Sequence, residues 1–290
     1  MRSLLFVPGD DERKVAKGLA SAADALILDL EDAVAPARKA AAREICAKAI
    51  ASSKSAKRLF VRVNALDTGQ TLSDLAAIVP AGPYGVVLPK CRGGDDVRAV
   101  GRYLAKLEAK DGIPQGQTRI LPIATENGAS MFGLGTYADP PLPRLCGLMW
   151  GGEDLAADIG AIRNRGADGL YTAPFQLARS LCLFGAAAAS VIAIDAVFTD
   201  FRDVDGVRKE AEEGLRDGFS AKAAIHPDQA APINAAFTPS AADIEWAKRV
   251  VAAFDASTGT GVASIDGKML DRPHYRGAKR VLERAAGASS

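Results

Sequence analysis

The sequence has almost no net charge, few cysteines and histidines, and no long apolar segment. Its 290 residues include four cysteines without a CxxC pair and only two histidines, so a disulfide framework and a zinc site are not indicated. The net charge of +1 gives no basis for a nucleic-acid partner or a membrane surface. The N-terminal apolar run ends at Pro8 and is too short for a signal peptide or a membrane-spanning helix. We therefore expect a cytoplasmic protein.

Eight short apolar runs are the main feature of the chain. Most are rich in Val, Ile and Leu without clean alternation, a pattern typical of strands that are buried on both faces of a parallel sheet. The runs are Ser3–Pro8, Ala25–Asp32, Arg58–Asn64, Gly85–Lys90, Arg119–Thr125, Leu145–Gly152, Ser190–Ala196 and Ala221–Pro227.

Helical segments separate several of these runs. They are Asp11–Ala23, Arg38–Ser52, Asp95–Lys110, Tyr171–Ala188 and Val204–Asp217, followed by Ser240–Phe254 after the last run. Alternating strands and helices predict βαβ units with right-handed crossovers. Eight such strands fit a closed (β/α)8 TIM barrel better than an open sheet, and the chain is slightly longer than a single barrel needs.

We assign residues 1–257 to the barrel and its last helix, and residues 258–290 to a C-terminal extension. The segment Ala253–Gly267 is rich in Gly, Ser, Thr and Ala and is interpreted as a linker. A turn and a short basic helix follow it, in the sequence GKMLDRPHYRGAKRVLER. Because a barrel does not need this extension, we expect it to cover the site as a lid or to bind a neighbouring subunit.

Polar residues lie at or just beyond the carboxyl ends of the runs. In a barrel these ends meet at one mouth, which is where such barrels carry their chemistry. A ring of carboxylates with one arginine and one lysine predicts a site for a divalent metal ion and an anionic substrate. The residues are Asp29, Glu31, Asp32, Arg62, Asn64, Lys90, Glu126, Glu153, Asp154 and Asp195.

Eight motifs occur in a characteristic order: RSLLFVPG, DALILDLEDAV, VRVN, VVLPK, ATENG, WGGEDLAADIG, FRD and AIHPDQ. Their order and spacing resemble the citrate lyase beta subunit-like family, which includes malyl-CoA lyases and lies within the HpcH/HpaI aldolase superfamily. The similarity runs from Arg2 to about Arg280. It implies a TIM barrel that uses Mg²⁺ to cleave or form a carbon–carbon bond next to an acyl thioester.

The resemblance also assigns roles to residues at the mouth. It implies that Glu126 and Asp154 hold Mg²⁺, which binds through one or two carboxylates and substrate oxygens, and that Glu126 and Arg62 belong to the substrate-binding residues. Arg62 is also implied to be catalytic, because a guanidinium can stabilise an enolate oxygen. From the residues alone, Glu126 and Asp154 could instead be solvated or helix-capping carboxylates, and Arg62 could form an ion pair with the Asp29–Asp32 cluster.

Four residues are predicted to hold the metal-binding and substrate-binding groups in place without being the metal ligands themselves. They are Asp29, Glu31, Asp32 and Lys90. By the alternation of side chains along a strand, Asp29 and Glu31 share a face and could hydrogen-bond Arg62 or metal-bound water. For Asp32 a capping or surface role is an equal alternative. Lys90 could form a Schiff base, but nearby carboxylates favour its charged form, so an ion-pairing or CoA-facing lysine is the better interpretation.

Asp271, in GKMLDRPH, matches the family's C-terminal catalytic aspartate. In relatives the extension resembles a lid that reaches the site of an adjacent subunit, where this residue would act as general acid and base on the acetyl carbon. The resemblance therefore implies a homo-oligomer, a trimer or a hexamer. The alternative role is an N-cap before the Pro273 helix. His226 is expected to be structural, and a substrate contact of His274 is not favoured.

These observations predict a Mg²⁺-dependent carbon–carbon lyase that converts a β-hydroxyacyl-CoA thioester of the malyl, citramalyl or citryl type into acetyl-CoA and a keto acid. Three alternatives remain open. The protein could be a citrate lyase beta subunit acting on citryl-acyl carrier protein, it could hydrolyse the malyl thioester in a malate synthase-like reaction, or it could be a non-catalytic CoA-binding barrel. An aldolase for free keto acids is less consistent with the extension and with the missing histidine base.

Overall fold

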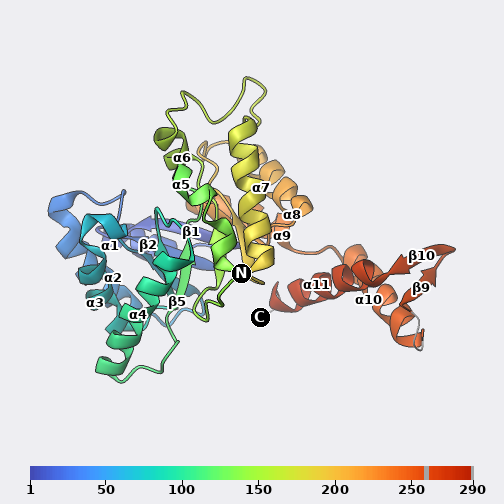
Figure 1. Ribbon diagram of the computed structural model, residues 1–290, viewed down its shortest axis with the longest axis horizontal. Helices are drawn as coiled ribbons and strands as arrows, with labels where there is room; N and C mark the ends of the chain where they lie inside the picture. The colour runs from blue at the N-terminus through green and yellow to red at the C-terminus, as the bar shows by residue number, and fades with distance from the viewer. Residues whose placement is uncertain (258–260, 289–290) are drawn as a thin grey trace.

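A computed structural model describes residues 1–257 and 261–288, which form a barrel and a C-terminal unit (Figure 1). Each predicted run contains one strand of the barrel, and most strands end a few residues before the run does, where the chain turns into the mouth. The strands are β1 (Ser3–Pro8), β2 (Ala25–Asp29), β3 (Arg58–Arg62), β4 (Gly85–Leu88), β5 (Arg119–Pro122), β6 (Gly147–Met149), β7 (Ile192–Asp195) and β8 (Ala221–Ala224).

The eight strands form one parallel sheet in the order β5-β4-β3-β2-β1-β8-β7-β6. The outermost strands β5 and β6 approach each other through single bridges between Ile120 and Leu145 and between Ile123 and Met149. The sheet is therefore curled into a nearly closed barrel, and the predicted TIM-like α/β fold is confirmed.

Apolar side chains fill both sides of the sheet. Ile27 and Phe60 pack inside the barrel, whereas Leu26, Leu28 and Val61 pack between the barrel and its helices. Since successive residues of a strand face opposite sides, a strand that is buried on both sides has to be apolar throughout. This arrangement explains the missing alternation in the sequence.

Helices follow most strands and cover the barrel, and the predicted helices are confirmed with small shifts at their ends. They are α1 (Glu12–Ala20), α2 (Lys39–Ser52), α3 (Thr71–Ile78), α4 (Gly94–Asp111), α5 (Gly128–Met131), α6 (Glu153–Asp158), α7 (Ala173–Ala188), α8 (Val204–Asp217) and α9 (Ala230–Phe237). Short 3-10 segments lie at Pro36–Arg38, Leu66–Thr68, Val79–Ala81, Leu134–Tyr137 and Pro227–Gln229. The eight-residue helices α3 and α9 are too short to give a clear period in the sequence.

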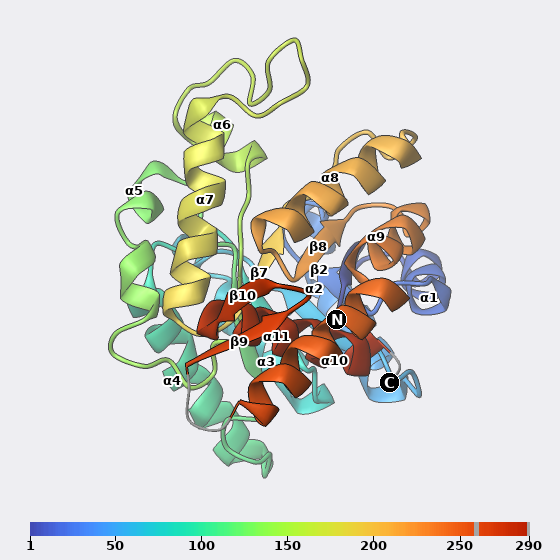
Figure 2. The same cartoon turned by 90° about the vertical axis from the view of Figure 1, so that its right-hand side faces the viewer.

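The C-terminal unit contains α10 (Ala241–Ala256), the antiparallel hairpin of β9 (Val262–Ile265) and β10 (Lys268–Asp271), and α11 (Arg272–Ala288). Figure 1 shows it projecting from one side of the barrel, and in the turned view of Figure 2 it lies in front of the barrel. Its own apolar cluster holds it together, and this cluster is formed by Ala247, Val250, Ile265, Leu270 and Ala278.

The linker interpretation of Ala253–Gly267 is wrong in part. Helix α10 continues to Ala256 and Val262–Ile265 form a strand, while residues 258–260 lie outside the described residues. The strand forms because Ala263 and Ile265 are buried, whereas Val262 and Ser264 are exposed. The predicted short basic helix is α11, which has 17 residues. The extension is thus present, and the division of the chain at residue 257 stays a prediction.

Among the described residues, no helix combines the length and the apolar composition that a bilayer span requires.

The separate apolar cluster of the C-terminal unit predicts that this unit can be weakened on its own. Leu270 is 5% exposed, so Leu270→Ala should destabilise the unit by about 2–5 kcal/mol. Hydrogen exchange followed by mass spectrometry should show faster exchange in 262–287 and unchanged exchange in β1–β8. The neighbouring Met269 is 74% exposed, and Met269→Ala is the matched control. Equal acceleration across the barrel strands would contradict a separate cluster.

Candidate active site at the barrel mouth

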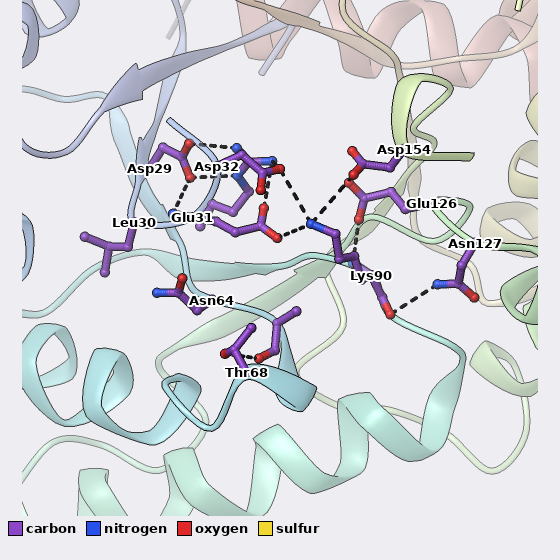
Figure 3. Close-up of polar contacts among 12 residues, drawn as sticks. Asp29, Leu30, Glu31, Asp32, Asn64, Thr68, Lys90, Glu126, Asn127 and Asp154 are labelled. Carbon is purple, nitrogen blue, oxygen red and sulfur yellow. Dashed lines mark hydrogen bonds and ion pairs between the residues drawn. The ribbon is translucent and has the colours of Figure 1, made fainter. Parts of the chain in front are cut away.

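The strand ends bring the predicted site residues together at one mouth (Figure 3). Asp29 and Arg62 end β2 and β3, and each lies two residues after an inward-facing residue, Ile27 and Phe60. Both side chains therefore face the barrel interior. Glu126 and Asp154 follow β5 and β6 and line the same cavity of about 290 Å³.

Arg62 and Asp29 form a two-pronged ion pair. The Nε and Nη2 of Arg62 each donate to one oxygen of Asp29 at 2.7 Å, and Nη1 lies 3.0 Å from Oε2 of Glu31. Burial alone would raise the pKa of Asp29, but the hydrogen bond and the charge of Arg62 hold it below its usual value. Arg62 is still part of the cavity wall, so the predicted ion pair and a substrate contact are compatible.

Lys90 connects three carboxylates around the mouth. Its Nζ lies 2.5 Å from Glu31, 3.5 Å from Asp32 and 3.6 Å from Asp154. Burial opposes its charge, but the hydrogen bond with Glu31 and the charge of Asp154 raise the pKa of Lys90 above its usual value. An ammonium held in this way is a poor nucleophile, which supports the ion-pairing interpretation over a Schiff base.

The backbone of Lys90 also orients Glu126. Lys90 has a φ of 53°, a left-handed conformation that is uncommon outside glycine. In this conformation its N–H donates to Oε2 of Glu126 at 2.5 Å. One residue therefore holds Glu126 through its main chain and contacts Asp154 through its side chain.

Glu126 is a buried carboxyl group in a negatively charged region. It is 4% exposed, and burial, reinforced by the charges of Asp154 and Glu31, raises the pKa of Glu126 to about 8. Gly151 permits this packing, since a Cβ there would lie 2.9 Å from Cγ of Glu126. Figure 3 shows the carboxyl groups of Glu126 and Asp154 pointing toward one another.

This donor set fits one kind of metal ion. No group of three or more His, Cys, Asp or Glu side chains is arranged around a common metal position in the described parts of the chain, which argues against a structural zinc site. Two carboxylates beside an open cavity match Mg²⁺, which takes one or two carboxylates and fills its other positions with water or substrate oxygens. A cation between the two carboxylates would also offset the cost of burying Glu126.

Several other polar residues lie away from the reacting region. Asp195 lies one residue after the inward-facing Ile194, so it points out of the barrel and accepts a hydrogen bond from Trp150 at 2.5 Å. Asn64 binds the buried Asp74. The side chain of Asp32 is 56% exposed at the rim. These three do not line the cavity.

Glu153 and Asp154 are adjacent in sequence but differ in their partners. Glu153 accepts a hydrogen bond from Asn164 at 2.7 Å, whereas Asp154 faces Lys90 and Glu126. The arrangement favours Asp154 over Glu153 as a metal ligand, and this assignment stays a prediction.

Asp271 lies at the end of β10, in the C-terminal unit. Among the described residues, none after Ile225 lines the cavity, so a catalytic role for Asp271 requires a second copy of the chain. His274 lies with Nδ1 2.5 Å from Oδ1 of Asp271, and this hydrogen bond lowers the pKa of Asp271. A substrate contact of His274 is not favoured by the sequence, whereas this contact places His274 directly beside Asp271. His226 caps a 3-10 segment and stacks on Phe201, a structural role as predicted.

The apolar side of the cavity was not identified from the sequence. It joins residues at β1, at the ends of β5 and β6, and in the loops after β7 and β8, so that no local motif marks it. Its members are Phe6, Ile123, Met149, Trp150, Val197 and Ile225.

Comparisons with known proteins agree with this geometry. Residues 2–227 match the HpcH/HpaI aldolase/citrate lyase family, and the chain belongs to this family. A (3S)-malyl-CoA thioesterase of Cereibacter sphaeroides is 36% identical over 289 residues, which cover 98% of this chain and 94% of that protein. The mitochondrial citramalyl-CoA lyase of Mus musculus is 32% identical over 293 residues, with 97% and 85% covered.

A solved structure is similar over nearly the whole chain. The crystal structure of CitE from Mycobacterium tuberculosis, in complex with magnesium, acetoacetate and coenzyme A, has a TM-score of 0.76 and 33% identity and covers 98% of both chains. The similarity therefore extends beyond the barrel into the C-terminal unit.

The raised pKa of Glu126 predicts a pH dependence of stability in EDTA. Between about pH 4.3, the usual pKa of a glutamate, and about 8, its pKa in the folded chain, only the unfolded chain has released the proton. The contribution of Glu126 to the unfolding free energy of the parent should therefore fall as pH rises, by up to about 1.4 kcal/mol per pH unit. In Glu126→Gln this contribution is absent, so the stability advantage of the variant should grow from pH 5 to pH 8.

Urea unfolding at several pH values measures this difference. The exposed neighbour Glu153 provides the control variant Glu153→Gln, which should keep a constant offset from the parent. A constant offset for Glu126→Gln as well would show that the carboxyl group of Glu126 is ionised throughout.

Proposed function

We propose that this protein is a Mg²⁺-dependent carbon–carbon lyase that cleaves a β-hydroxyacyl-CoA thioester into acetyl-CoA and a keto acid. The observation that carries the proposal is the pair Glu126 and Asp154, which share one cavity with Arg62. The family, the citramalyl-CoA lyase relative and the magnesium and coenzyme A complex of CitE support it.

Glu126 and Asp154 are the residues that would hold the metal ion. When bound, Mg²⁺ supplies Lewis-acid polarisation of the substrate oxygens next to it. Lys90 fixes the orientation of Glu126 and partly balances the charge of Asp154. Glu31 and Asp29 keep Lys90 and Arg62 in place.

Arg62 is the residue that stabilises negative charge on oxygen during cleavage. The substrate hydroxyl loses its proton, the bond between the hydroxyl-bearing carbon and the α-carbon of the thioester breaks, and its electron pair becomes the enolate of the acetyl thioester. The former hydroxyl carbon becomes the carbonyl of the keto acid. A preorganised guanidinium of this kind acts by electrostatic stabilisation, which is often the largest contribution to catalysis.

Asp271 of a neighbouring copy completes the reaction by taking up a proton from solvent, which replaces the proton that the substrate hydroxyl released to solvent, and passing it to the enolate carbon. In the condensation direction the same group, which its lowered pKa keeps ionised at neutral pH, removes that proton. This role makes the active form a homo-oligomer, and a trimer or hexamer accords with the family resemblance. The acyl-CoA, or an acyl carrier protein thioester, and a small keto acid are the partners.

Hydrolysis of malyl-CoA is a second candidate, favoured by the similarity to a (3S)-malyl-CoA thioesterase. Both reactions could use the same metal and the same Arg62. The products differ, because hydrolysis gives malate and free CoA, whereas cleavage gives glyoxylate and acetyl-CoA.

A product assay tests the proposal and separates it from the alternative. The purified protein should convert (S)-malyl-CoA or (S)-citramalyl-CoA into acetyl-CoA and a keto acid with Mg²⁺ and lose this activity in EDTA, because the carboxylates alone do not polarise the substrate. Glu126→Ala should abolish Mg²⁺-dependent binding of the keto acid in calorimetry. Free CoA and malate as the only products would establish the thioesterase, and no turnover would favour a carrier-protein substrate or a binding protein.

The role of Asp271 makes a separate prediction. Asp271→Asn should lower turnover roughly 100-fold or more, the usual contribution of a positioned proton donor, and leave keto-acid binding with Mg²⁺ intact. Asp266, in the turn of the same hairpin, is exposed and pairs with Arg249, so Asp266→Asn is the matched control and should keep parental turnover. Parental turnover in Asp271→Asn would remove this residue from the mechanism.

A further inference from the structure

The cavity is lined by two unlike sets of side chains, and this difference bears on the side chain of the keto acid. The charged set is Arg62 with the carboxylates Asp29, Glu126, Glu153 and Asp154. The apolar set, which we call the apolar wall, is formed by Phe6, Ile123, Met149, Trp150, Val197 and Ile225. Of these apolar residues, Ile123, Met149 and Trp150 are almost fully buried, so close packing fixes their side chains in place.

Two buried contacts hold the aromatic part of this wall in position. The indole of Trp150 donates to Asp195, which Arg179 holds with two hydrogen bonds of 3.1 and 3.0 Å. Tyr171 meets Trp150 edge to face, with ring centroids 4.9 Å apart. Asp195 and Arg179 do not line the cavity, whereas Tyr171 does, so no cation of this network faces a ligand.

Arg62 is the one cation on the cavity wall among the described residues. Its charge is already balanced by Asp29 and Glu31. The cations nearby are engaged elsewhere, since Lys90 pairs with Glu31 and Arg165 lies over the ring of Tyr171, 3.7 Å from its centroid, and pairs with Glu210.

The mouth as a whole is negative, with the six carboxylates of Asp29, Glu31, Asp32, Glu126, Glu153 and Asp154 against the two cations of Arg62 and Lys90. The N-terminus of α6 borders the cavity, but Glu153 and Asp154 occupy its first turn and repel an additional anion. One carboxylate of a substrate can be accommodated beside a metal ion and Arg62, whereas the described lining residues provide no further cation for a second carboxylate.

We infer that the keto acid handled by this site carries a small apolar group, such as the methyl of pyruvate, rather than a second carboxylate such as that of oxaloacetate. The inference rests on the proposed function, which it makes more specific. In the thioester, the hydroxyl-bearing carbon then holds a methyl or similar group, and citramalyl-type substrates are preferred over citryl-type substrates.

Direct binding of free keto acids tests the inference without requiring turnover. The matched pair is 2-oxobutyrate and oxaloacetate, in which a methyl group replaces a carboxylate on the same carbon. Calorimetry with Mg²⁺ should give Kd values for pyruvate and 2-oxobutyrate that are roughly 100-fold lower than for oxaloacetate. The second carboxylate of oxaloacetate would be buried without a cation partner and near other carboxylates, which lowers the affinity by several factors of ten.

Residue 225 offers a variant that should reverse the ranking. Ile225 is 40% exposed, so a charged side chain is tolerated there. Ile225→Lys should strengthen oxaloacetate binding at least tenfold relative to 2-oxobutyrate, whereas the uncharged control Ile225→Met should keep the parental ranking.

The outcomes separate this inference from the proposed function. Oxaloacetate binding as tightly as 2-oxobutyrate to the parent would overturn the inference even if lyase activity is present. The expected ranking without cleavage of any thioester would support the inference about the cavity and overturn the lyase. No Mg²⁺-dependent binding of any of these keto acids would overturn both.

Discussion

The concentration of negative charge at the barrel mouth is the constraint on which the rest of the site depends. The carboxyl ends of parallel strands meet at one rim, and the side chains there include six carboxylates. Arg62 and Lys90 neutralise part of this charge but leave Glu126 with a pKa raised to about 8. The fold therefore contains a position where a divalent cation is electrostatically favoured before any substrate arrives.

The lining of the cavity joins charged and apolar side chains from the same strand ends. Glu126 lies three residues after Ile123, and Asp154 lies four residues after Trp150. A buried network of Asp195 and Arg179, outside the barrel lumen, holds Trp150 in place. The direction in which a strand's last residue points decides whether its side chain faces the cavity or packs behind it.

That direction also explains how far the sequence could be interpreted. The apolar runs predicted all eight strands, and strand ends identified Asp29, Arg62, Glu126 and Asp154, because both follow from local composition. Asp195 looked equivalent in sequence, but it lies one residue after Ile194 rather than two and faces outward. The hairpin of β9 and β10 and the apolar wall depend on contacts between distant segments, which no local pattern records.

The left-handed backbone of Lys90 restricts the amino acids that can replace it during evolution. Gly, Asn and Asp adopt this conformation most readily, yet none of them carries a positive charge. Arginine is the other long side chain with a positive charge, but its planar guanidinium does not replace the compact ammonium of lysine. Position 90 must satisfy a backbone requirement and a charge requirement at once, so we expect it to accept few substitutions even as the surrounding cavity diversifies toward other acyl groups.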